Sequence, residues 1–101
     1  MNVYCVSYDL NKAGQDYDGV IEELKKSYSW WHYLDSTWLI ATNESASVLS
    51  ERIRKFTDDN DYLLVIRVTN NYAGWLPQKA WDWIKQHVTQ TAQSNSSYRR
   101  Y

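Results

Sequence analysis

Glycine, proline and cysteine are scarce in this chain of 101 residues, which contains three, one and one of them, respectively. With so few glycines the chain has neither a Walker-type loop nor a dinucleotide-binding loop. The single cysteine, Cys5, cannot form an intramolecular disulfide and favours a reducing compartment. One cysteine and two histidines also argue against a structural zinc site.

Long apolar runs and a strong net charge are missing as well. No apolar run approaches the ~20 residues that a membrane-spanning helix requires, and the chain begins without the basic-then-apolar pattern of a secretory signal. We therefore expect a cytoplasmic protein with no membrane partner. The net charge of −1 gives no general attraction to nucleic acids, so binding of that kind would require a local basic patch.

Aromatic residues are what the chain has in excess, with six tryptophans and nine tyrosines. Such rings bury large areas and are also enriched at protein interfaces. The length suits one domain with one core, which we place at residues 1–88. Residues 89–101 are polar and lack periodicity, so we expect them to form a flexible tail.

The stretch 2–11 has the β-branched and aromatic composition of a strand. Both of its faces are largely apolar, which predicts a central strand covered on both sides. One face would carry Val3, Cys5 and Ser7, and the other Tyr4, Val6 and Tyr8. Asp9 follows at the strand's end, where a buried strand reaches the rim of the sheet.

A helix is predicted after Asp16, whose carboxylate is a good N-cap. Glu22 and Lys26 are spaced to form an ion pair on its solvent side, which Glu23 and Lys25 would share. The residues predicted to face inward recur at helical spacing and are Tyr17, Val20, Ile21, Leu24 and Tyr28.

Two further helices are predicted. The first would be capped by Asn43 or Ser45 and the second, residues 78–88, would follow Pro77, whose missing N–H is no loss in a first turn. The inward-facing residues would be Val48, Leu49, Arg52, Ile53 and Phe56 in the first, and Ala80, Trp81, Ile84 and Val88 in the second.

Three more strands complete the prediction. Residues 30–34 and 37–42 would form a β-hairpin around the two-residue turn Asp35-Ser36. Residues 62–69 would form the last strand, whose continuous apolar run at 63–66 is typical of burial on both faces.

The element order is therefore β-α-β-β-α-β-α, and its first six elements match the ferredoxin-like arrangement. This is an α+β fold with a four-stranded antiparallel sheet and two helices on one face. The other face, to which we assign Val3, Cys5, Leu63 and Val65, must be covered by the last helix, a second subunit, or both. We expect a homodimer.

In this topology one rim of the sheet gathers the end of the first strand, the hairpin turn and the start of the last strand. Carboxylates at such a rim suit Mg²⁺ or Mn²⁺, which take oxygen ligands and can activate water. The alternative is that most of these residues form turns and caps, and Asp9 is the strongest metal-binding candidate. The rim residues are Asp9, Asn11, Gln15, Asp16, Asp35, Ser36, Asp59 and Asp61.

Basic and aromatic residues give a second set of candidates. Arg52, Arg54 and Lys55 share one predicted helix and are candidates for phosphate contacts, as are Lys12 near the rim and Arg99 and Arg100 of the tail. Trp30, Trp31, Tyr33 and Trp38 can stack on bases, but we favour roles in the core and a dimer interface. His32 and His87 can serve as general bases, although neither has a partner at a recognised spacing, and packing is the simpler role.

Several segments resemble the small bacterial and phage proteins labelled "SinR family", a label shared with an unrelated helix-turn-helix regulator. The resemblance covers residues 1–88 and rests on Tyr8-Asp9-Leu10-Asn11-Lys12, on 15–17, on the Trp-Trp-His-Tyr-Leu-Asp-Ser-Thr-Trp run at 30–38, and on 64–68. More distantly, the Tyr-Asp strand end and the element order resemble the small dimeric CRISPR-associated nuclease and VapD-type ribonucleases.

The distant resemblance implies a metal-dependent nuclease in which Asp9 is the catalytic and Mg²⁺-binding residue. Two features differ from that nuclease pattern. The arginine that follows the strand is missing, with Lys12 the only nearby base, and Ser36-Thr37-Trp38-Leu39-Ile40 replaces a Ser-Val-Phe-Glu-type strand. The hypotheses are thus a dimeric nucleic-acid-binding protein, with or without nuclease activity on RNA or DNA, and a non-catalytic homodimeric module that binds a protein or small ligand.

Overall fold

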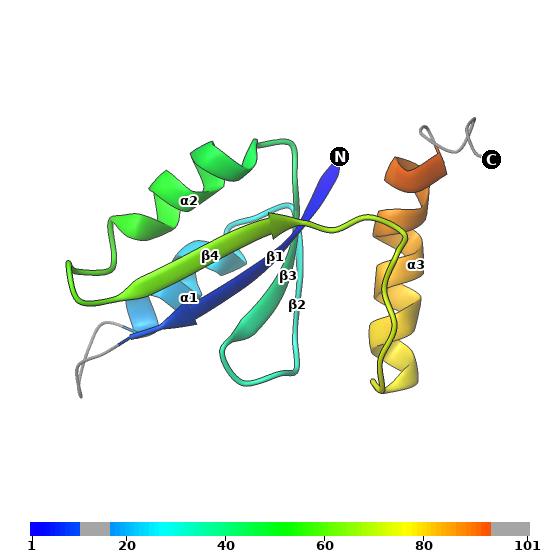
Figure 1. Cartoon of the computed structure of the whole chain (residues 1–101), viewed down its shortest axis with the longest axis horizontal. Coiled ribbons are helices and arrows are strands. Elements are labelled where there is room, and N and C mark those ends of the chain that lie inside the picture. The colour runs from blue at the N-terminus through cyan, green and yellow to red at the C-terminus, as the bar shows by residue number, and fades with distance from the viewer. Residues whose placement is uncertain (11–16, 94–101) are drawn as a thin grey trace.

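The computed structural model describes residues 1–10 and 17–93 of the chain. The strands form one antiparallel sheet in the order β2-β3-β1-β4, so the α+β fold class is confirmed and the order is compatible with the ferredoxin-like arrangement. Figure 1 shows α3 standing apart from α1 and α2. The elements are β1 (Asn2–Asp9), α1 (Tyr17–Lys25), β2 (Ser29–His32), β3 (Thr37–Thr42), α2 (Ala46–Arg54), β4 (Tyr62–Arg67) and α3 (Gln78–Gln93).

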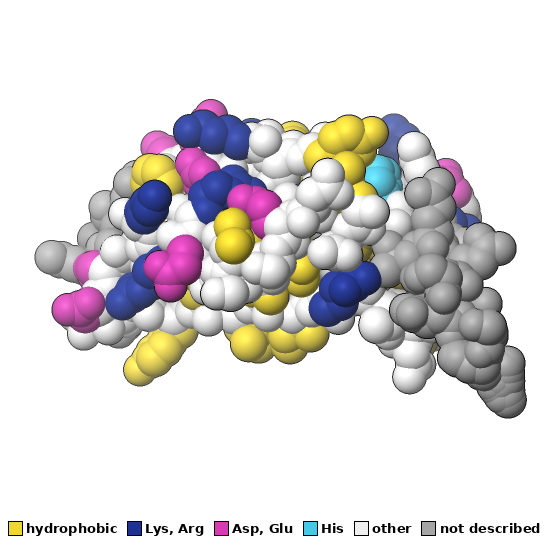
Figure 2. Space-filling view, turned by 90° about the horizontal axis from the view of Figure 1, so that it is seen from above, with side chains coloured by type: hydrophobic (Ala, Val, Ile, Leu, Met, Phe, Trp, Pro, Cys, Tyr) yellow, Lys and Arg dark blue, Asp and Glu magenta, His cyan; other side chains and the backbone are white. Residues whose placement is uncertain are grey.

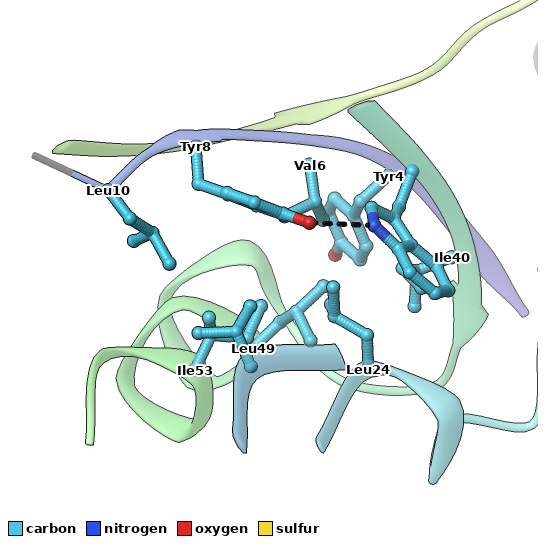
Figure 3. Packing of buried hydrophobic residues seen from close by; sticks show 10 residues of the cluster. Tyr4, Val6, Tyr8, Leu10, Leu24, Ile40, Leu49 and Ile53 are labelled. Carbon is cyan, nitrogen blue, oxygen red and sulfur yellow. Dashed lines mark hydrogen bonds between the residues drawn. The ribbon is translucent and has the colours of Figure 1, made fainter. Parts of the chain in front are cut away.

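The main core lies between the sheet and the two helices α1 and α2. Trp38 of β3 is at its centre, 1 % exposed, and its Nε1–H donates a hydrogen bond of 3.1 Å to the Tyr8 hydroxyl (Figure 3). Burial of these apolar side chains is the dominant favourable contribution to folding. The other buried members are Tyr4, Val6, Leu10, Val20, Leu24, Ile40, Leu49 and Ile53.

A second core lies on the opposite face of the sheet, under α3. Val3 and Ala41 of the sheet pack there with Ile84 and Val88 of the helix. The Trp83 Nε1–H also donates to the Ser29 hydroxyl at 2.9 Å, which ties α3 to β2. The central strand β1 is therefore packed on both faces, as its sequence predicts, and α3 provides part of the cover on this second face.

The strand register corrects one prediction about that face. Leu63 pairs with Tyr8 and Val65 with Val6, so both side chains point toward α1 and α2 rather than lying beside Val3 and Cys5. In addition, β4 is at the end of the strand order, and β1 is its one neighbouring strand among the described residues. The prediction that the run 63–66 is buried on both faces is therefore wrong for the single chain, because alternate residues of this edge strand are exposed.

The first helix ends earlier than its apolar spacing predicts. Because α1 stops at Lys25, Tyr28 lies beyond it and is exposed rather than buried. Glu23, predicted to face solvent, is only 8 % exposed. Lys26 forms its ion pair with Glu23 at 3.2 Å, where the sequence predicts Glu22 as the partner. The predicted cap, Asp16, lies outside the described residues.

The start of α2 agrees with prediction, because the Ser45 hydroxyl accepts a hydrogen bond from the Val48 N–H at 3.2 Å. Leu49 and Ile53 are buried, whereas Val48, predicted to face inward, is 53 % exposed. Val48 precedes Leu49 by one residue, which is about 100° around an α-helix, and therefore lies on the solvent side of α2.

The hairpin and the last helix also differ from the predicted boundaries. The connection between β2 and β3 spans residues 33–36, with Asp35 and Ser36 at the centre of a turn closed by a 3.1 Å hydrogen bond from the Thr37 N–H to the Leu34 carbonyl. Helix α3 continues past the predicted end at Val88 to Gln93. Residues 94–101 lie outside the described part of the chain.

Candidate functional site

The predicted rim is present at the end of β1. Asp9 pairs in register with Tyr62 at the start of β4, and the Tyr8 N–H donates to the Ser36 carbonyl of the hairpin turn at 3.3 Å. The Asp9 side chain is exposed and has no hydrogen-bond or ion-pair partner among the described residues. The carboxylate at the end of this central strand therefore makes no contact that stabilises the described part of the fold.

Of the other described acidic residues of the rim, Asp61 and Asp59 use their carboxylates in local contacts, and Asp35 contributes its backbone carbonyl. Asp61 is 8 % exposed, and its Oδ2 accepts from the Asp58 N–H at 2.9 Å, which closes the turn before β4. Asp59 pairs with Arg54 at 3.5 Å. The carbonyl of Asp35 accepts a hydrogen bond from the His32 ring. These contacts match the turn-forming alternative for the residues around Asp9.

No group of three or more His, Cys, Asp or Glu side chains suited to a metal ion occurs among residues 1–10 and 17–93. The predicted rim residues Asn11, Gln15 and Asp16, together with Lys12, fall outside these ranges. Within the described part, Asp9 therefore does not belong to a group of three or more such side chains.

Arg52, a predicted phosphate contact, is engaged within the fold. Its Nε and one terminal nitrogen donate to the Glu44 carboxylate at 3.0 and 2.9 Å. The other terminal nitrogen donates to the Glu23 carbonyl and carboxylate at 2.8 and 3.0 Å, and the fifth N–H goes to Ser27 at 3.0 Å. A guanidinium has five N–H groups, so none is left for a phosphate.

The two carboxylates that receive these bonds are held in the ionised form. Burial alone would raise the pKa of Glu23, but hydrogen bonds from Arg52 and Lys26 outweigh it and lower the pKa overall. The hydrogen bond from Arg52 lowers the pKa of Glu44, against a smaller opposing effect of burial. Arg52, Glu23 and Glu44 therefore form a structural ion cluster that joins α1, α2 and the β3–α2 connection.

The other basic candidates of α2 lie at its end. Arg54 donates to the Thr57 hydroxyl at 3.0 Å and to the Asp58 carbonyl at 2.8 Å. Lys55, the C-cap, is exposed. Figure 2, which looks down on the α2 side, shows basic and acidic side chains interspersed on this surface. This surface is thus not a basic patch of the kind that phosphate binding favours.

Both histidines are packed on tryptophans. The His32 ring stacks on Trp38 with centroids 4.0 Å apart and planes 9° from parallel. The His87 ring stacks on Trp83 at 4.2 Å, and its Nδ1–H donates to the Trp83 carbonyl at 2.8 Å. Neither ring has a carboxylate partner in the described part of the chain. Their contacts therefore agree with the simpler prediction, that both histidines are packing residues.

An exposed apolar row shares the face of the sheet that carries Asp9. Tyr62, Leu64 and Ile66, which we call the β4 row, are 70, 56 and 53 % exposed. By register they lie beside Asp9, Ser7 and Cys5, respectively, on the face that α3 covers only in part. A shallow groove of about 210 Å³ runs between the row and Asp9. Figure 2 shows hydrophobic side chains projecting along the lower margin of the view.

The β4 row went unpredicted because its residues stand inside a continuous apolar run. The sequence signal for it is the position of β4 at the end of the expected strand order, because side chains of an edge strand have neighbours on one side only and are covered less completely than those of a central strand.

None of the helices described here is long and apolar enough to cross a membrane. No family model, curated protein or solved structure matches the chain, so only its own fold and contacts bear on its function.

Proposed function

We propose that this chain acts as a homodimeric binding module, in which the β4 row of one copy packs against the same face of a second copy. The observation that carries the proposal is the exposure of Tyr62, Leu64 and Ile66 on one edge strand. Three neighbouring large apolar side chains on one face are unusual for a surface that stays in water. In an isologous contact each copy contributes the same patch, so the β4 rows of both copies are buried against each other.

The edge of β4 supports the same proposal. Its six residues, Tyr-Leu-Leu-Val-Ile-Arg, carry a single charge, at the terminal Arg67, and contain no proline; charges and prolines are the usual means of keeping an edge strand from pairing. A second copy is the occupant with matching chemistry, because an apolar row contacts its own kind without burying a charge. Asp9 lies at the end of the row, where it stays at the margin of such an interface.

The oligomeric state tests this proposal. We expect wild-type chains to sediment at twice the monomer mass of 12.0 kDa. Leu64→Lys should weaken dimerisation by at least about tenfold, because it replaces a buried apolar contact by two facing charges. Sedimentation equilibrium over a range of concentrations measures the dissociation constant.

Val48→Lys is the matched control, because Val48 is as exposed as Ile66 but lies on α2. It should leave the dissociation constant unchanged. A wild-type mass of one chain, or an equal effect of Leu64→Lys and Val48→Lys, would contradict the proposal.

A second candidate function, metal-dependent cleavage of RNA or DNA, is favoured by the unpartnered carboxylate of Asp9. Mg²⁺ binds proteins through one or two carboxylates and keeps several waters, so a single Asp9, or one from each subunit of a dimer, fits its requirements. A bound ion of this type would supply an activated water and polarise the phosphodiester. Asp9 would hold the ion, and the adjoining groove would stay open for the RNA or DNA strand.

Cleavage assays separate the two functions. If the second candidate is right, labelled single-stranded RNA or duplex DNA is cut with Mg²⁺ but not with EDTA, and Asp9→Asn lowers the rate at least about tenfold by removing one charged ligand. Asp59→Asn, an exposed carboxylate near the same rim, should leave the rate unchanged. Absence of cleavage by wild-type protein, or cleavage that survives Asp9→Asn, would reject this function and leave the binding module.

A further inference from the structure

A pocket of about 340 Å³ lies on the second face of the sheet, between β2, α3 and the connection from β4 to α3. Its size is at the lower end of the range for small-molecule sites in proteins. Its lining excludes Asp9 and all three residues of the β4 row. The pocket therefore shares no lining residue with the β4 row or with the candidate cleavage site, and it adjoins the row at Cys5, which lies beside Ile66.

Aromatic side chains from three separate segments converge on this pocket. Trp31 comes from β2, Tyr72 from the connection and Trp81 from α3. Trp31 stacks on Tyr33 with ring centroids 5.8 Å apart, and Tyr72 stacks on Trp81 at 6.0 Å with planes 20° from parallel. Trp31 and Trp81 therefore each have an aromatic neighbour within the fold. A pocket walled in this way favours a flat ring that can stack or meet the walls edge to face.

The charges around the pocket restrict the ligand further. Arg67 is the only residue with a charged side chain among the described residues that line it. Arg67 pairs in register with Tyr4, so its side chain leaves the sheet on the side of α1 and α2, away from the pocket floor. An anionic ligand would therefore lose hydration without a cation on the pocket floor, and no acidic residue is among the described lining residues to pair with a cationic ligand. Thr37, Thr69 and Asn71 supply polar groups that suit a neutral heteroatom.

From these contacts we infer that this pocket binds an uncharged, planar heteroaromatic molecule of one or two fused rings, held between Trp31 and the Tyr72–Trp81 pair. The inference does not depend on the homodimer or on cleavage at Asp9. Indole is a suitable neutral probe, and benzoate and choline are an anionic and a cationic probe of comparable or smaller size.

The single cysteine gives a site-specific readout, because Cys5 lines the pocket and is only partly buried. Burial raises the pKa of its thiol, so its alkylation should be slower than that of a free cysteine. We expect saturating indole to slow the alkylation of Cys5, and benzoate and choline to have no effect at the same concentrations. The concentration dependence of this protection gives the apparent affinity.

Trp31→Ala should weaken indole binding by about two- to tenfold, the loss of one aromatic wall. Trp75→Ala is the matched control, because Trp75 is 98 % exposed and does not line the pocket. Leu64→Lys should retain indole binding whether or not it dimerises. Protection by choline or benzoate in place of indole, no protection at all, or equal losses in Trp31→Ala and Trp75→Ala would overturn the inference.

Discussion

Replacing Trp38 by alanine should lower the free energy of unfolding by about 3–5 kcal/mol, the range for removal of a buried large aromatic side chain. Trp38 is 1 % exposed and is enclosed on several sides. Its ring lies 4.0 Å from His32 and 5.3 Å from Trp30, and its N–H bonds to Tyr8. A domain of this size is stable by about 5–15 kcal/mol in total, so the loss is a large fraction of its stability.

Urea unfolding followed by far-ultraviolet circular dichroism measures this effect, at one fixed protein concentration because dimerisation would add to the apparent stability. Trp75→Ala removes the same side chain from an exposed position and should change the free energy by less than about 0.5 kcal/mol. If Trp38→Ala does not fold, Trp38→Phe keeps most of the packing and should show a smaller loss. Equal stability of Trp38→Ala and Trp75→Ala would contradict the assignment of the core.

Replacing Arg52 by methionine should cost about 3 kcal/mol, because it leaves the buried carboxylate of Glu23 without its main partner. The expected value is at the low end of the range for buried pairs, since the Arg52 side chain keeps 22 % of its exposure. Arg54→Met is the matched control on the same helix. Its ion pair is exposed, so the expected loss is below about 1 kcal/mol.

The cost of Arg52→Met should depend on pH in a defined direction. Contacts with Arg52 lower the pKa of Glu23 and of Glu44 in the folded state. The stabilisation from a carboxylate with a lowered pKa is complete above its unfolded pKa of about 4.3 and is lost as the pH falls further. The stability difference between wild type and Arg52→Met should therefore shrink between about pH 7 and about pH 3.

Denaturant titrations at several pH values measure this difference. If the stability difference between wild type and Arg52→Met stays constant or increases on acidification, the Arg52 cluster stabilises the fold by packing rather than by charge. A cost no larger than that of Arg54→Met would show that the five hydrogen bonds of Arg52 contribute little.

Local patterns in the sequence predict most of this fold. The strand composition of 2–9, the cap at Ser45 and the helical spacing of Ala80, Ile84 and Val88 depend on near neighbours, and the structure agrees with each of them. The ferredoxin-like order of the first six elements then places the end of β1 beside the start of β4. This is why the rim around Asp9 could be predicted without any contact being known.

Long-range pairing explains where prediction was wrong. Glu23 has the spacing of a solvent-facing residue on α1, and only Arg52 of α2 makes its burial favourable. The same contact removes Arg52 from the candidates for phosphate binding. A continuous apolar run such as 63–66 looks alike in a central strand and in an edge strand, and the register with β1 decides which of its residues are exposed. The aromatic pocket is formed by side chains from separate segments, among them Trp31, Tyr72 and Trp81, and no one of these segments has a sequence pattern that predicts it.

The most direct test of the proposed dimer is an isotope-filtered nuclear Overhauser experiment on a mixture of labelled and unlabelled chains. It detects only contacts between different copies, and the methyl groups of Leu64 and Ile66 are its natural reporters. The proposed interface predicts contacts between copies at both residues and none at Val48. Contacts confined to Val48 or to other surfaces, or none at concentrations where the chains associate, would contradict the assignment of the β4 row as the dimer interface.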